Sequence, residues 1–209
     1  MVTLHGLEHG RTDTRPSVDG DVLVDIRSDR AALREVAAFF TQQSFDPDPG
    51  PGGLLHRFKR ELDADFIVVD VLAPDNVGSR ADLTTRPPGR TLQVPGGTQA
   101  LRRVERVLVT VADRSGEIPR PNVLGAIIAK AAASDLPGDP DRHLRDLAFL
   151  LSLAPDPVRS RSELSPAERR SLRRCALIAR RHRIWNTLPG AEANAGHAAL
   201  SLLAAVPRG

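Results

Sequence analysis

Two aspartates separated by one residue are the side chains in this sequence best placed to do chemistry. Asp19 and Asp21 lie at the start of an apolar run, in the stretch Arg15-Pro-Ser-Val-Asp-Gly-Asp-Val-Leu-Val. Residues i and i+2 of a β-strand point to the same face, so both carboxylates can reach one ion. Hard divalent cations prefer oxygen ligands and keep waters that a phosphate can replace. The spacing therefore predicts a site for Mg²⁺ or Mn²⁺.

A third carboxylate, Asp70, interrupts the apolar segment Phe66-Ile-Val-Val-Asp-Val-Leu. Such a continuous apolar run is typical of a buried strand rather than of a half-solvated edge. Burying an unpaired carboxylate costs roughly several kcal/mol unless the group meets a cation or a hydrogen-bond donor. We therefore predict that Asp19, Asp21 and Asp70 are ligands of one metal site.

The order of these residues resembles the minimal nucleotidyltransferase fold, and within it the AbiEii-like group found in bacterial toxin–antitoxin pairs. The resemblance covers most of residues 15 to 153. The residues that carry it are Ser17-x-Asp19-x-Asp21, the strand residue Asp70, the helix lysine of Ile127-Ile-Ala-Lys130-Ala, and Asp146 in Arg142-His-Leu-Arg-Asp-Leu. An Asp-x-Asp pair alone is weakly specific, whereas the ordered set is moderately specific.

This resemblance implies an enzyme that moves a nucleotide from a nucleoside triphosphate to a hydroxyl acceptor, often a tRNA 3′ end. Asp19 and Asp21 would then bind a Mg²⁺ that bridges the nucleotide phosphates, and Asp70 would bind a second ion and activate the acceptor hydroxyl. The resemblance also implies that three further residues line the nucleotide cleft: Ser17, Lys130 and Asp146. A cognate antitoxin is the implied protein partner.

Two features depart from the family pattern. Members carry a Gly-Gly or Gly-Ser pair on a helix ahead of the two aspartates, where backbone N–H groups hold the triphosphate. No such pair precedes Asp19 here, and residues 1–5 read as the second half of a helix. In addition, Gly20 separates the two aspartates, which predicts a bulge or a close backbone approach.

The missing glycine pair leaves several alternatives open. Either the start codon is assigned too late, or the chain has lost its phosphate-binding segment. In the second case the chain would be a non-catalytic relative that binds a protein or a nucleic acid. A third alternative is a structural cluster of acids in an unrelated α+β domain.

Length and composition set the outer bounds. The chain has 209 residues, of which 41% are hydrophobic, enough for one domain or for a domain with a small appendage. Its single cysteine, Cys175, excludes a disulfide framework. Because the sequence contains no apolar run of the roughly 18 residues that a membrane span needs and no signal-peptide pattern, we expect a cytoplasmic protein without a membrane partner.

The basic residues are nearly all arginines, since Lys59 and Lys130 are the only lysines. A basic cluster between residues 169 and 183 repeats at helical spacing. Such a cluster can bind nucleic-acid phosphates, although a solvated helix face is the more common explanation. The same two interpretations apply to Arg80, Arg86 and Arg90, in the Pro- and Gly-rich stretch from 73 to 97.

The predicted architecture is α+β, with a small mixed nucleotidyltransferase-like sheet domain over residues 1–116 and a helical region over 117–209 packed on it. The expected strands are 21–26, 56–60, 66–72, 91–94 and 104–111. One helix is expected to begin at residue 28 and a second at residue 121. A third is expected to end at residue 153, a fourth to begin at a capping box at 165–168, and a last one to cover 191–205.

Overall fold

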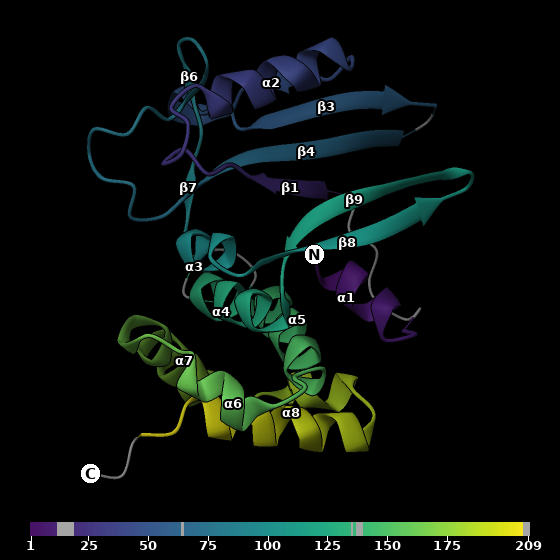
Figure 1. The fold of residues 1–209 in the computed structure, drawn as a ribbon, viewed down its shortest axis with the longest axis vertical. Helices are drawn as coiled ribbons and strands as arrows, with labels where there is room; N and C mark the ends of the chain where they lie inside the picture. Colours follow the sequence, from purple (N-terminus) through teal and green to yellow (C-terminus); the bar gives the residue numbers. More distant parts are fainter. Residues whose placement is uncertain (12–18, 64, 135, 137–139, 207–209) are drawn as a thin grey trace. The chain divides into compact units, whose positions relative to one another are not determined.

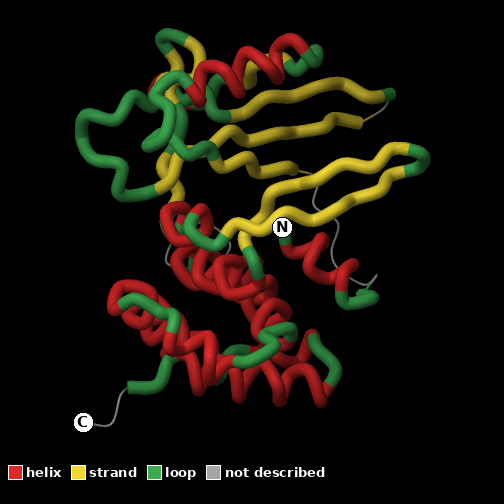
Figure 2. The backbone as a smooth tube through the Cα atoms, viewed as in Figure 1, coloured by secondary structure: helices red, strands yellow, loops and turns green. Residues whose placement is uncertain are grey.

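The computed structural model of the chain describes residues 1–11, 19–63, 65–134, 136 and 140–206. The fold is α+β with a mixed sheet, as the sequence predicts (Figure 2). It consists of two compact units, residues 15–101 and residues 1–14 with 102–209. Among the described residues, no helix has both the length and the apolar character needed to cross a bilayer.

The boundary between the units differs from the expected one after residue 116. The structure places it after Leu101, so that the hairpin of residues 104–121 belongs to the helical unit. Contacts inside that unit explain the assignment. The backbone N–H of Asn122 donates to the carbonyl of Arg103 at 2.7 Å, and a ring nitrogen of His5 donates to the carbonyl of Pro121 at 3.0 Å.

The main sheet lies in the unit of residues 15–101 (Figure 1). Its strands are β1 (Asp19–Leu23), β2 (Asp46–Asp48), β3 (Arg57–Leu62), β4 (Asp65–Pro74) and β7 (Gln93–Val94). The strand order is β1-β4-β3-β2, and β7 also pairs with β4. The β1–β4 and β4–β7 pairs are parallel, and the β2–β3 and β3–β4 pairs are antiparallel. The remaining elements are α2 (Ala32–Gln42), the 3₁₀ turn η1 (Pro51–Gly53), β5 (Thr84–Arg86), β6 (Gly89–Arg90) and α3 (Gly97–Leu101).

One face of this sheet is apolar because apolar residues alternate along β3 and β4. Phe58, Val69 and Val71 share that face and form a buried cluster with Leu33 and Ala37 of α2. Successive side chains of a strand point to opposite faces, so the charged residues that alternate with these apolar ones lie on the other face of the sheet.

The β1 strand is regular through Gly20. Asp19, Gly20 and Asp21 pair in sequence with Val68, Val69 and Asp70, so the predicted bulge is absent. A Cβ at Gly20 would lie 3.9 Å from the Val68 carbonyl oxygen, an ordinary contact, so the close backbone approach is absent as well.

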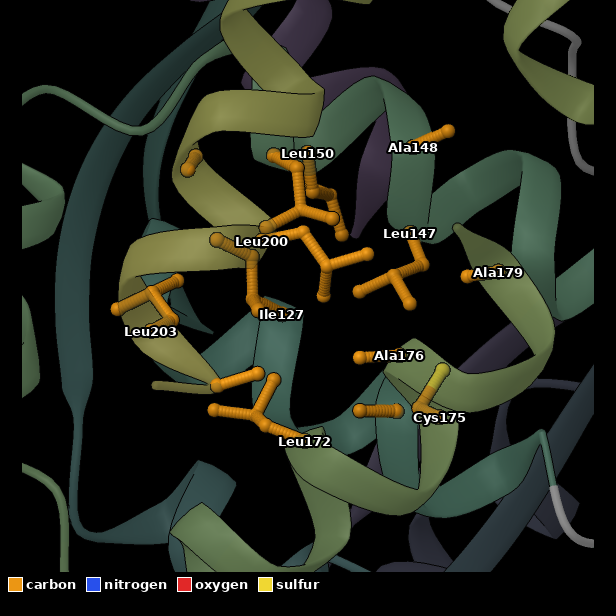
Figure 3. Packing of buried hydrophobic residues seen from close by; sticks show 14 of the residues in the cluster. Ile127, Leu147, Ala148, Leu150, Leu172, Cys175, Ala176, Ala179, Leu200 and Leu203 are labelled. Carbon is orange, nitrogen blue, oxygen red and sulfur yellow. The ribbon is translucent and has the colours of Figure 1, made fainter. Parts of the chain in front are cut away.

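The other unit contains a hairpin and a helical bundle. The elements are α1 (Val2–Glu8), β8 (Val104–Val111), β9 (Arg114–Pro121), α4 (Val123–Ala133), α5 (Pro140–Ser152), α6 (Pro157–Ser162), α7 (Pro166–Ala179), the 3₁₀ turn η2 (Arg183–Thr187) and α8 (Gly190–Leu203). Side chains from α4, α5, α7 and α8 point toward one another in the bundle core (Figure 3). Cys175 is buried there and is not part of a disulfide.

Local capping explains several helix starts. The predicted capping box is confirmed, because Ser165 and Glu168 each bond to the other's backbone N–H at the start of α7. Asn122 caps α4 by accepting from the N–H of Gly125 at 2.9 Å. The expected helix start at Ser28 is wrong: α2 begins at Ala32, since the Asp29 carboxylate accepts from the N–H of Ala31 in a turn that precedes the helix.

A pair of glycines in α8 tests the packing of the bundle. A Cβ at Gly196 would lie 2.6 Å from Trp185 and 3.3 Å from the Ala148 carbonyl oxygen, whereas a Cβ at Gly190 would meet nothing within 4 Å. We expect Gly196→Ala to destabilise the fold by about 1–3 kcal/mol through overpacking. Gly190→Ala is the matched control and should be neutral or stabilising by up to about 1 kcal/mol. Urea unfolding of both variants measures this, and similar stabilities would contradict the packing described.

Candidate functional site

The three predicted aspartates lie on one face of the sheet, which is its charged face. In the strand register, Asp21 lies directly beside Asp70, and Asp19 lies one pleat further along β1 on the same face. Asp21 is exposed, Asp19 is half-buried and Asp70 is buried. The row of register neighbours continues across β3 and β2. From β1 to β2 it consists of Asp21, Asp70, Arg57 and Asp48, and we call it the charged row.

The closest interaction in the charged row is the ion pair between Arg57 and Asp70. Arg57 Nε donates to Asp70 Oδ1 at 2.8 Å and Nη2 donates to Oδ2 at 2.7 Å. This two-point contact holds the carboxylate in one orientation. The hydrogen bond to Asp70, together with the charges of Asp19 and Asp48, raises the pKa of the Arg57 guanidinium, although burial opposes that rise.

A second charged pair lies one pleat along from the first. Lys59 Nζ is 2.7 Å from Asp48 Oδ2, and Lys59 pairs in register with Val68 of β4 and with Asp46 of β2. The prediction of the site did not include Arg57, Lys59 or Asp48. The alternation of residues 56–60, which indicates a half-exposed strand paired with Asp70's strand, was the signal that could have identified them.

The predicted residues of the helical unit form a pair of their own. Lys130 Nζ of α4 lies 2.7 Å from Asp146 Oδ2 of α5, and both side chains are largely buried. The structure therefore joins the two residues that the resemblance assigns to a nucleotide cleft. Ser17, the remaining one, lies outside the described residues.

The donor chemistry of the charged face suits a hard divalent cation, because carboxylate oxygens are the ligands that Mg²⁺ and Mn²⁺ prefer. In this structure, however, Asp19, Asp21 and Asp70 do not form a group whose ligand atoms all lie within 4.8 Å of one another. Arg57 already takes one lone pair of each Asp70 oxygen, and each oxygen keeps a second lone pair for a further partner. That the three aspartates bind one metal site therefore stays a prediction.

A second group of potential metal ligands was not predicted from the sequence. His5 and Glu8 of α1 and Glu105 of β8 each offer an atom, and these atoms lie within 4.8 Å of one another. Arg120 lies among them: it pairs with Glu8, and its Nε donates to Glu105 Oε1 at 3.1 Å. His5 is fully buried and its Nε2–H donates to the Pro121 carbonyl.

Arg120 makes this group an ion-pair cluster rather than a metal site. Its guanidinium, only 4% exposed, neutralises both carboxylates and occupies the position of a cation. Burial and then the charge of Arg120 lower the pKa of His5 from 6.5 to about 4, so positive charge is unfavourable at the imidazole. The cluster therefore fastens α1 to the β8–β9 hairpin.

Comparison with known proteins adds no identification. No family model matches the chain, and neither a curated protein nor a solved structure matches it. The function is therefore argued below from the residues and their geometry.

The Arg57–Asp70 pair leads to a prediction about stability. We expect Asp70→Asn to lower the free energy of unfolding by about 1–2 kcal/mol, less than for a fully buried pair because Arg57 is 39% exposed. Asp65→Asn, which removes an exposed acid of the same strand, is the matched control and should change stability by no more than about 0.5 kcal/mol.

A double variant separates the pair from other effects. If Arg57 and Asp70 stabilise each other, Arg57→Gln/Asp70→Asn loses less than the sum of the single variants in urea unfolding. Strictly additive losses, or equal losses for Asp70→Asn and Asp65→Asn, would contradict the pair's role.

His5 leads to a prediction about pH. Since the folded pKa of about 4 lies below the unfolded value of 6.5, the unfolded chain takes up a proton first as pH falls. The contribution of His5 to the free energy of unfolding is therefore fully present above pH 6.5 and is lost progressively as the pH falls to about 4. His5→Gln should remove that part of the pH dependence measured by urea unfolding, while His9→Gln, at the C-cap of the same helix, should keep it. Identical pH profiles for wild type and His5→Gln would refute the assignment.

Proposed function

We propose that the chain is a metal-dependent nucleotidyltransferase that moves a nucleotide from a nucleoside triphosphate to a hydroxyl acceptor such as tRNA or another RNA. The observation that carries the proposal is the register pair of Asp21 and Asp70, with Asp19 on the same face. Mg²⁺ sites that act on phosphates are bound through carboxylates, and three carboxylates on one face of neighbouring strands supply that kind of ligand. The resemblance to AbiEii-like toxins supports the same reaction class and suggests an antitoxin as partner.

Within this proposal each residue of the charged row has a distinct role. Bound Mg²⁺ or Mn²⁺ would neutralise charge on the phosphates during transfer. Asp19 and Asp21 would hold the ion from β1. Asp70 would complete the ligand set from β4, with its orientation fixed by Arg57.

Asp70 keeps the two roles expected for it, as a metal ligand and as the acceptor of the hydroxyl proton. Both of its oxygens accept hydrogen bonds from Arg57, and each keeps a second lone pair for a further partner. Ser17, Lys130 and Asp146 stay in the proposal as nucleotide contacts on the strength of the resemblance alone.

A second function is favoured by a specific observation. Asp70 and Asp146 each have a basic partner already, in Arg57 and Lys130. An acid whose charge is balanced by a side chain needs no metal, so these pairs also suit a catalytically impaired relative. Such a chain would act as a protein- or nucleic-acid-binding module.

Metal binding and transfer together separate the two functions. The enzyme proposal predicts that millimolar Mg²⁺ or Mn²⁺ raises the melting temperature of the wild type, because a bound cation removes repulsion between the carboxylates. Asp19→Asn/Asp21→Asn should abolish both this shift and the transfer of labelled nucleotide to an RNA pool. Glu61→Gln/Asp65→Asn, which removes two exposed acids of β3 and β4, should keep both. An equal metal shift in all three proteins, or no shift in any, would favour the binding module.

A further inference from the structure

An arginine-lined groove lies in the unit of residues 15–101. Its volume is about 660 Å³, and it is bounded by the segments that follow β1 and β4 and by the start of α2. Among its lining residues are four arginines and one carboxylate: Arg27, Arg30, Arg34, Arg80 and Asp82. Its lining therefore carries a net charge of +3, which favours an anionic ligand.

Two of these arginines are held in place by neighbouring groups. Arg27 donates to the hydroxyl of Thr98, whose backbone N–H in turn donates to Asp75 Oδ1 at 2.9 Å. Arg34 Nη1 lies 2.7 Å from Asp82 Oδ2. Guanidinium groups fixed before a ligand arrives lose less conformational entropy on binding.

The other two arginines are available to a ligand. Arg30 and Arg80 are exposed, and neither forms an ion pair or a hydrogen bond with any residue of the described ranges. Each guanidinium offers five N–H donors in a fork that matches phosphate oxygens. Arginines gathered on one groove repel each other in the absence of an anion, so a bound phosphate would relieve that repulsion.

A second hollow adjoins the groove at Arg34. It has a volume of about 400 Å³ and lies between α2 and the β5 segment. Its lining combines the small apolar residues Ala37, Ala38 and Pro87 with polar and charged ones: Arg34, Thr41, Gln42, Thr85 and Arg86. The two hollows thus offer phosphate-binding groups next to a surface that suits an unpaired base.

We propose that the groove and the adjoining hollow bind single-stranded nucleic acid. The phosphodiester backbone would lie along the arginines of the groove, and an unstacked base would lie in the adjoining hollow, in contact with its apolar residues and with the guanidinium plane of Arg86. A strand fits both sites at once, because its phosphates and bases repeat along the chain. A free nucleoside triphosphate has the same phosphate chemistry, so the experiment distinguishes the two sources.

The test is binding of a fluorescein-labelled single-stranded oligouridylate, followed by anisotropy without metal or nucleotide. Arg30→Gln/Arg80→Gln should weaken binding by about tenfold or more, and should reduce the slope of log K against log salt by about 1.4, that is about 0.7 for each lost phosphate contact. Neither residue has a partner among the described residues, and unchanged thermal melting verifies the fold. Arg102→Gln/Arg114→Gln removes the same charge outside the groove and should keep wild-type affinity.

Three outcomes would overturn the proposal. The first is an equal loss of affinity in both double variants, which indicates only net charge. The second is a loss confined to Arg170→Gln/Arg181→Gln in and after α7, which places the nucleic acid on the basic cluster. The third is full displacement of the oligonucleotide by an equal concentration of ATP, which makes a free nucleotide the occupant.

This inference deepens the proposed function, and it rests on that function only in naming the acceptor. Binding is measured without chemistry, so the two can fail separately. Wild-type binding with no nucleotide transfer would count against the enzyme and leave the groove intact. Transfer to RNA that is insensitive to Arg30→Gln/Arg80→Gln would count against the groove and leave the enzyme intact.

Discussion

The two-point ion pair between Arg57 and Asp70 is the interaction on which the charged face of the sheet depends. Asp70 lies in the middle of the sheet, on β4, with Asp21 beside it on β1. Without Arg57 the sheet would place two adjacent carboxylates, one of them buried, with no compensating charge in the row. The pair thus permits acids in a strand that would otherwise be apolar, and any cation that binds there must share Asp70 with it.

The sheet separates stability from chemistry by its two faces. Its apolar face packs on α2 and supplies the core of residues 15–101, centred on Phe58 and Leu33. Its charged face contributes little apolar burial and holds the charged row instead. Substitutions on the charged face can therefore change binding without removing the core, which makes this face a suitable place for a site.

Ion pairs recur wherever this chain buries a charge. Glu168 is an example in the helical unit: burial by itself raises the pKa of its carboxyl, but hydrogen bonds from Arg103 and Ser165 outweigh burial and lower the pKa overall. Lys130 with Asp146 and Arg120 with Glu8 follow the same rule. Arg30 and Arg80, by contrast, are exposed and make no such pair with any described residue, and they share one groove with Arg27 and Arg34.

The sequence by itself determined the α+β class, the apolar strand around Asp70, the 104–111 strand and the capping box at Ser165. These features depend on local periodicity and on hydrogen bonds between residues close in the chain, and both can be read from a single stretch. Likewise, the shared face of Asp19 and Asp21 follows from the two-residue period of a strand.

Only the tertiary structure decided which residues become neighbours across strands and helices. The register that places Arg57 against Asp70, and the α1–hairpin contact that gathers His5, Glu8 and Arg120, join positions far apart in the sequence. Likewise, the arginines after β1 and β4 line one groove because parallel pairing brings the two strand ends together. Local pattern can indicate that two strands pair, as it does for residues 56–60, but it does not fix the register or the helix contacts, because these are chosen by the burial of whole faces.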